Sequence, residues 1–168
     1  MACATFVSCV AAMPGSAQDI GSAATASDVA KHVAIDPTTY APAVAYFVSA
    51  RLDWSSSQPF FRQGITEHNP DFTVSGRADD APISYAAGNR RIVAAALGTA
   101  GLSVANNVTE GLFERALNRR DPDHRKLWHA LGWIERIGFA SYLGYQESVL
   151  HIQQWQVNRQ LAAERGYH

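Results

Sequence analysis

Two Asp-Pro dipeptides, at positions 36–37 and 121–122, mark where long helices begin. Asp is favoured as a helix N-cap because its carboxylate accepts a hydrogen bond from a free backbone N–H, and Pro is favoured at the first helical position. Behind each dipeptide the apolar residues return with the 3.6-residue period of a helix. These signals predict an all-α fold.

The predicted fold has three main helices in a small antiparallel bundle. The first helix begins at Asp36-Pro37 and ends between Pro59 and Gly64, the second covers residues 89–118, and the third covers residues 122–163. Proline blocks the continuation of a helix and glycine favours its end, which explains the first boundary. Residues 65–88 carry turn signals in close succession, so we expect a long ordered loop between the first and second helices.

The first 18 residues have features of a secretory signal peptide. No charged residue precedes Asp19, residues 2–13 are apolar, and Gly15-Ser16-Ala17 supplies the small residues of a cleavage site. A basic start is missing, which indicates that the true start lies upstream. The alternatives are a buried apolar helix of the mature protein and a lipoprotein anchored at Cys9. Export predicts a protein of a bacterial periplasm or envelope.

Behind this segment, residues 19–35 are rich in Ala, Ser and Gly and are predicted to form a linker, or a weak short helix around residues 26–33. Residues 36–168 are predicted to form a single helical domain. Both cysteines, Cys3 and Cys9, lie in the signal segment. Its removal leaves no thiol for a disulfide, a nucleophile or a metal site.

The charge pattern argues against nucleic acid as a partner. The formal net charge is −1, so no overall field attracts phosphates. The densest basic run lies between the second and third helices, and its residues are candidates for peripheral contact with lipid headgroups or with an acidic partner: Arg119, Arg120, Arg125 and Lys126.

Insertion into a membrane is the main alternative to a water-soluble or peripheral domain. Residues 92–109 carry no charge and include the close-packing pairs Ala94/Gly98 and Gly101/Ala105. The third helix, however, is interrupted by Glu135-Arg136, and each central charge costs roughly 2.5–3.5 kcal/mol on insertion scales. Three spans behind a cleaved signal would also place the basic run outside, against the positive-inside rule. A soluble or peripheral domain is therefore favoured.

Polar residues on otherwise apolar helices form the predicted structural cluster. Asp53 is expected to pair with an arginine such as Arg91 or Arg136, and Asn106 and Asn107 are expected to bind the backbone of the 65–88 loop. The predicted members of this cluster are Asp53, Glu67, Asn69, Asn106, Asn107, Glu110 and Arg136.

A metal site in the bundle is a weaker alternative, built from Asp53, Glu110, Glu147 and His151. The spacing of Glu147 and His151 is Glu-x-x-x-His, whereas carboxylate-bridged di-iron bundles use Glu-x-x-His. No Gly-x-Ser-x-Gly motif and no Gly-rich phosphate loop occurs. No catalytic residue and no cofactor is therefore predicted.

The remaining large side chains suggest a surface for a partner. An apolar groove in the bundle is predicted from these residues: Trp54, Phe60, Phe61, Trp133 and Tyr142. The predicted function is therefore an exported, non-catalytic structural or interaction module of the cell envelope, with an unknown protein or membrane partner. The alternatives are a small integral membrane protein with an internal polar cluster, whose Asp53, Arg91, Glu110 and Arg136 turn inward, and a small metal-binding helical enzyme.

One short stretch resembles a known pattern. Asp53 with Ser56 and Ser57 ends a helix, and Gly64-Ile65-Thr66-Glu67-His68-Asn69-Pro70 follows. This arrangement resembles the Gly-x-x-Glu-x-Asn-Pro corner of small uncharacterised bacterial helical proteins, several of which look like integral membrane proteins. The resemblance implies that Asp53, Glu67 and Asn69 hold the corner together. The polar residues after the corner depart from the pattern, and no activity is implied.

Overall fold

The computed structural model describes residues 20–167, with side chains described from Ala26 onward. The predicted signal peptide and both cysteines lie outside these residues. The described chain is helical, and its extended pairing is limited to two isolated bridges, Glu67 with Asp80 and Thr73 with Pro82. The prediction of an all-α fold is confirmed.

Four α-helices and three short 3-10 helices make up the described chain. In order they are α1 (Ile20–Ile35), η1 (Pro37–Thr39), α2 (Ala41–Arg62), η2 (Pro70–Phe72), α3 (Tyr85–Arg120), η3 (Pro122–His124) and α4 (Arg125–Arg165). The helix α1 lies where the sequence predicts a linker or a weak short helix. The segment between α2 and α3, which contains η2, is the predicted long loop.

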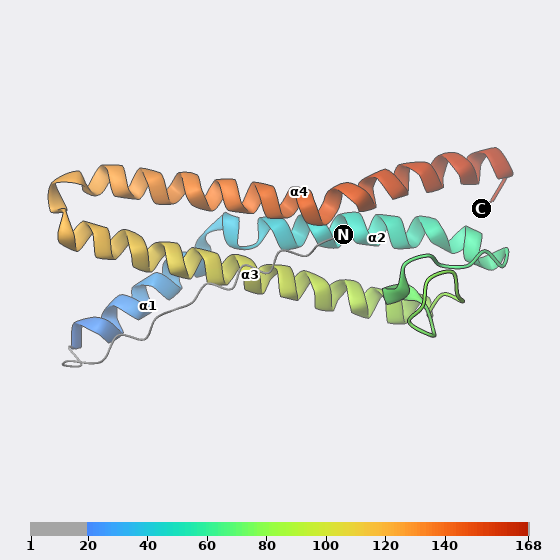
Figure 1. Ribbon diagram of the computed structural model, residues 1–168, viewed down its shortest axis with the longest axis horizontal. Helices are drawn as coiled ribbons and strands as arrows, with labels where there is room; N and C mark the ends of the chain where they lie inside the picture. The colour runs from blue at the N-terminus through green and yellow to red at the C-terminus, as the bar shows by residue number, and fades with distance from the viewer. Residues whose placement is uncertain (1–19, 168) are drawn as a thin grey trace.

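The helices α2, α3 and α4 run side by side along the long axis of the molecule (Figure 1). In Figure 1, α2 runs towards the right, α3 returns to the left, and α4 runs back to the right. The hairpin of α3 and α4 extends to the left beyond the start of α2, and α1 packs obliquely against α3 there. The loop between α2 and α3 lies at the right end, below the end of α4 (Figure 1).

Local capping explains where the helices begin and end. The Asp36 carboxylate accepts a hydrogen bond from the backbone N–H of Thr38 at 2.9 Å, so the first Asp-Pro dipeptide starts η1, and α2 follows it. The second dipeptide starts η3 in the same way, although the Asp121 carboxylate contacts His124 instead of a backbone N–H. The helix α4 ends at Gly166, whose positive φ of 66° suits glycine at a helix C-terminus.

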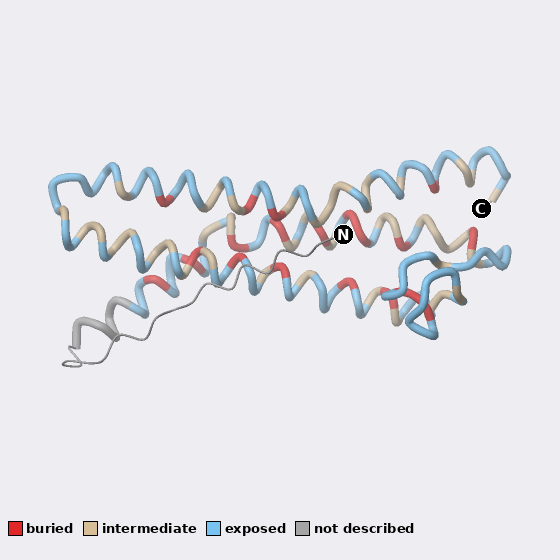
Figure 2. Tube along the Cα trace, in the orientation of Figure 1, coloured by how far each residue is buried: buried red, intermediate tan, exposed pale blue. Residues whose placement is uncertain are grey.

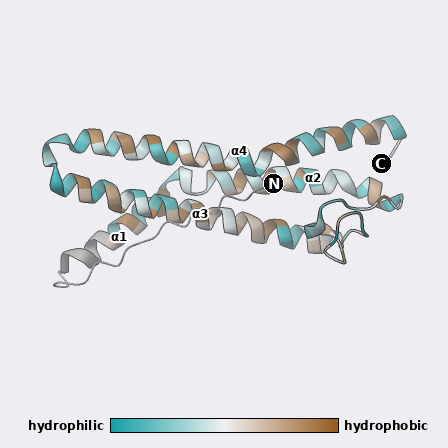
Figure 3. Cartoon of the chain, viewed as in Figure 1, coloured by the Kyte–Doolittle hydropathy of each residue, from teal (hydrophilic) through white to brown (hydrophobic). Residues whose placement is uncertain are grey.

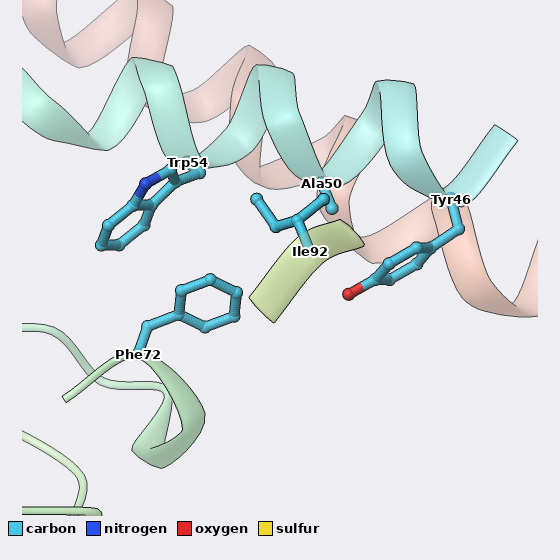
Figure 4. Packing of buried hydrophobic residues seen from close by; sticks show 5 residues of the cluster. All are labelled: Tyr46, Ala50, Trp54, Phe72 and Ile92. Carbon is cyan, nitrogen blue, oxygen red and sulfur yellow. The ribbon is translucent and has the colours of Figure 1, made fainter. Parts of the chain in front are cut away.

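The apolar core lies where the loop folds back onto α2 and α3. It consists of Tyr46, Ala50, Trp54, Phe72 and Ile92 (Figure 4). The Trp54 ring lies 5.0 Å from the Phe72 ring, between centroids, and its indole N–H donates to the Tyr85 carbonyl at 3.2 Å.

Gly88 makes this packing possible. A Cβ added at Gly88 would lie 2.3 Å from Trp54 Cε2, so the first turn of α3 approaches the indole as closely as only glycine permits. This contact sets how α3 is placed and rotated against α2.

Candidate functional site

The polarity of α3 is inverted relative to that of a helix on a water-soluble bundle. The residues that α3 buries are mostly small or polar: Gly88, Ile92, Thr99, Ser103 and Asn107. Its exposed side carries large apolar residues: Val93, Leu97, Leu102, Val104, Leu112 and Phe113. Figures 2 and 3 show this pattern, since much of α3 is both exposed and apolar.

The helix α4 shows the same inverted polarity: one stripe of small, charged and polar residues faces inward, and an apolar stripe lies on the opposite side. Its inner stripe faces the other helices and contains Gly132, Arg136, Ala140, Leu143, Glu147 and His151. Its outer stripe contains the exposed residues Leu127, Leu131, Ile134, Gly138, Tyr142 and Tyr145, and the half-buried Val149. The five largest exposed side chains of this outer stripe, those of Leu127, Leu131, Ile134, Tyr142 and Tyr145, are 47–64% exposed. Such an apolar surface on a helix indicates a missing partner or an apolar surrounding.

A first internal polar network joins α2 to α4. His151 Nδ1 lies 2.8 Å from Asp53 Oδ2, and both side chains are about four-fifths buried. Two turns further along α4, the Asn158 amide donates to Ser57 Oγ at 2.9 Å and to Ser56 Oγ at 3.1 Å. The network therefore satisfies buried polar groups of both helices by bonds between them.

The residues around this network are acidic. His151 lies edge-on to Tyr46 with 5.6 Å between the ring centroids. Burial raises the pKa of Tyr46, and the charges of Glu147 and Asp71 raise it further. Burial also raises the pKa of Glu67, against the hydrogen bond from the Asn69 backbone N–H, which lowers it. His151 lies in this acidic region and contacts Asp53.

A second internal network lies towards the hairpin end, between η1, α3 and α4. Arg136 Nε is 3.2 Å from Asp36 Oδ2, at an angle outside that of a hydrogen bond, and Arg136 Nη1 is 3.6 Å from Glu114 Oε2. His129 Nδ1 is 2.9 Å from Glu114 Oε1. Burial and the charge of Glu135 raise the pKa of Glu110, while Arg136 lowers it.

Gly132 makes room for this network. A Cβ at position 132 would lie 3.0 Å from Glu110 Oε1 and 3.1 Å from Glu114 Oε2. The carboxylates therefore lie directly over the backbone of α4. Removing Arg136 would leave buried carboxylates without their cation, which is the costly way to break such a network.

Asn107 holds η1 against α3. Its amide donates to Thr39 Oγ1 at 2.8 Å and to Thr38 Oγ1 at 3.0 Å, and the Thr39 hydroxyl donates to the Val33 carbonyl at 2.7 Å. The sequence predicts instead that Asn107 binds the backbone of the 65–88 loop. That prediction is wrong because α3 runs away from the loop, and position 107 lies six turns beyond its start.

The predicted polar cluster is thus divided over the length of the bundle. Asp53 pairs with His151, and not with Arg91 or Arg136, since Arg136 belongs to the second network and Arg91 is exposed. Glu67 accepts a hydrogen bond from the Asn69 backbone N–H at 2.7 Å, within the corner before η2. The remaining members lie with the second network or beside η1: Asn106, which donates to Glu135, Asn107, Glu110 and Arg136.

The predicted metal ligands are divided as well. The structure brings Asp53 and His151 together, with Glu147 one turn before His151 on α4, whereas Glu110 lies in the second network. Within residues 20–167 no group of three or more His, Cys, Asp or Glu side chains is arranged to hold a metal ion.

The predicted partner groove is corrected by the structure. Trp54 is buried against Phe61 and against Phe72 of the returning loop, and Phe60 is buried and packs on Tyr167 after the end of α4. Trp133 and Tyr142 are exposed on α4. Only these two of the five residues are therefore available to a partner, and the exposed apolar surface lies on α3 and α4.

Sequence reasoning missed three participants: Asn158, Glu114 and His129. Asn158 follows Glu147 by eleven residues and His151 by seven, so the helical repeat places all three on one face of α4. This helical repeat is the sequence signal by which Asn158 could have been added to the network. Glu114 and His129 carry no comparable signal, because their pairing depends on how the hairpin of α3 and α4 closes.

The comparisons with known proteins find no matching protein family, no matching curated protein and no matching solved structure. Among the described helices one, α3, is long and apolar enough to cross a membrane by length and composition.

Proposed function

We propose that this protein is an exported, non-catalytic helical interaction module of a bacterial cell envelope. The observation that supports it is the inverted polarity of α3 and α4. On their inner faces Asn107, Arg136, His151 and Asn158 pair with other elements, while the hydroxyls of Thr99 and Ser103 donate to carbonyls of α3 itself. The apolar outer faces have no cover within the described chain. A surface of this kind binds another apolar surface. The finer prediction of an antiparallel bundle of α2, α3 and α4 is part of this proposal, with α1 as an added helix.

The arrangement of the first network supports a non-catalytic role. A serine nucleophile needs its hydroxyl against the histidine that activates it. Here Ser56 Oγ and Ser57 Oγ both donate to the Asp53 carbonyl, at 2.8 Å and 3.1 Å, as hydroxyls commonly do inside a helix. The same hydroxyls accept from the Asn158 amide of α4, so they join α2 to α4, as the Asp53–His151 pair does.

The location follows from the N-terminal segment. An apolar stretch with a small-residue exit is typical of export. The basic side chains at the turn between α3 and α4 are exposed and free to meet an acidic surface: Arg120, Arg125 and Lys126. Arg119 is exposed beside them. No nucleic-acid partner is proposed.

Fractionation of cells that express the full chain tests the location. The expected result is recovery in the periplasmic fraction, or release from membranes by a carbonate wash. Retention in the washed pellet would overturn the proposal. A cytosolic marker and a known integral membrane protein serve as controls for the two fractions.

A second candidate is a small integral membrane protein, and a specific observation favours it. The outer face of α3 carries no exposed charge from Ile92 to Phe113, a length of about 32 Å at a rise of 1.5 Å per residue, close to the thickness of a bilayer core. Asp53, Glu110 and Arg136 turn inward, as this candidate requires. Arg91, Lys31 and Glu135 are exposed, and an exposed charge is costly in lipid. This is why the interaction module is preferred.

A further inference from the structure

The outer stripe of α4 is symmetric about Gly138. Its members before Gly138 stand 4, 7 and 11 residues away, at Ile134, Leu131 and Leu127. Its members after Gly138 stand at the same distances, at Tyr142 and Tyr145, which are exposed, and at Val149, which is half-buried. The stripe therefore reads with the same spacing in both directions along the helix.

Such symmetry is what a two-fold contact between two antiparallel copies of one helix requires. In an isologous contact residue i of one copy meets residue j of the other, and j meets i. With the axis at Gly138, Ile134 would lie opposite Tyr142, and Leu131 opposite Tyr145. These two pairs each combine an aliphatic side chain with an aromatic one, so no two large rings lie opposite each other, and the third pair, Leu127 with Val149, is aliphatic.

Gly138 suits the position on the axis. It is exposed, and an added Cβ would meet no atom within 4 Å. The glycine is thus not needed for packing inside the chain. Two glycines facing each other across an axis allow the backbones of two helices to approach closely, which brings the flanking side chains into contact.

The charges on this surface are compatible with self-pairing. Between Leu127 and Val149 the exposed carboxylate beside the stripe is that of Glu135. Glu135 stands three residues before Gly138, so its antiparallel counterpart position is Ser141, and two Glu135 side chains would not face each other. The partner copy would approach from the side of α4 opposite to α1, α2 and α3, because the inner stripe occupies the other side.

The exposed apolar area lies at the lower end of what specific dimer interfaces bury. Five large side chains that are 47–64% exposed offer apolar area on the order of 500 Å² per copy, and neighbouring residues add to it. Interfaces of standard size bury about 800 Å² per partner, whereas specific interfaces begin at about 1,000 Å² in total, which two copies of this stripe reach.

We propose that α4 pairs with α4 of a second copy, antiparallel, about a two-fold axis at Gly138. The pairing rests on the proposed function, since it names the partner of that interaction module. Lipid on the same stripe is the competing occupant.

Cross-linking between single cysteines tests the pairing in the full chain with Cys3→Ser and Cys9→Ser. Two differently tagged versions, Ile134→Cys and Tyr142→Cys, are co-expressed and treated with a short bis-maleimide. The expected result is a cross-linked product containing both tags, and little product when either variant is expressed alone. Gly138→Cys is expected to cross-link to itself. Strong self-products of both Ile134→Cys and Tyr142→Cys would show a parallel pairing and overturn the proposal.

A second measurement does not depend on cross-linking. Gly138→Glu places two carboxylates at the axis and is expected to raise the dissociation constant of the dimer at least about tenfold by sedimentation or light scattering. Gly98→Glu on the exposed side of α3 is the matched control and is expected to leave it unchanged. Unchanged helicity by circular dichroism shows that both variants fold. A soluble wild type that stays monomeric overturns the pairing alone, whereas retention in the carbonate-washed pellet overturns the proposed function and with it the pairing.

Discussion

Replacing Gly88 by alanine separates helix propensity from packing, because the two effects have opposite signs. Alanine is favoured over glycine inside a helix by about 0.8–1.0 kcal/mol. At Gly88, however, the new Cβ would lie 2.3 Å from Trp54 Cε2 and 2.5 Å from Trp54 Cζ2. The indole cannot yield easily, since it packs against Phe61 and Phe72 and donates to the Tyr85 carbonyl.

The magnitude follows from these contacts. Overpacking a filled core costs about 1–3 kcal/mol, and loss of the indole hydrogen bond adds about 1 kcal/mol. After the gain in helix propensity, Gly88→Ala is expected to destabilise the protein by roughly 1–3 kcal/mol. Gly98→Ala is the matched control: Gly98 lies on the same helix with no atom within 4 Å of an added Cβ, so it is expected to stabilise the protein by roughly 0.5–1 kcal/mol.

Urea unfolding followed by circular dichroism measures both changes. If the unfolding free energy falls with urea at the same slope in all three proteins, the midpoint urea concentration of Gly88→Ala is expected to lie below that of the wild type. The midpoint of Gly98→Ala is expected to lie above it. If Gly88→Ala unfolds at the same or a higher urea concentration than the wild type, the close packing of α3 on Trp54 is refuted.

Further predictions concern the polar contacts. Asn107→Ala removes the amide that holds Thr39 and is expected to cost about 1–2 kcal/mol in urea unfolding, whereas Asn106→Ala, which loses one exposed bond, is expected to change stability by less than about 0.5 kcal/mol. Equal effects would contradict the role of Asn107. The hydrogen bond to Asp79 raises the pKa of His68 above its ordinary 6.5, so its contribution to stability is present below pH 6.5 and disappears as the pH rises through the raised pKa. In an NMR titration Asp79→Asn is expected to return the pKa of His68 towards 6.5, and an unchanged titration would refute the contact.

The sequence by itself determined the elements and many of their limits. The Asp-Pro dipeptides and Gly166 act within one turn of the chain, so the positions at which they start or end a helix do not depend on the rest of the fold. For α1 the sequence predicts only a linker or a weak short helix, because local signals are few there. Its composition has little apolar periodicity, and it is held by Val29 and Val33, which the fold buries beside α3.

Only the tertiary structure decided which polar residues meet and which apolar residues remain outside. Asp53 and His151 are 98 positions apart, and Asn107 and Thr39 are 68 positions apart. Their pairing depends on the rotation and the axial shift of one helix against another, which are set by packing such as that of Gly88 on Trp54. The same rotation turns the small and polar faces of α3 and α4 inward. The periodicity in the sequence showed that α4 has an apolar stripe, but the packing of the other helices on its opposite side decided that the stripe faces outward.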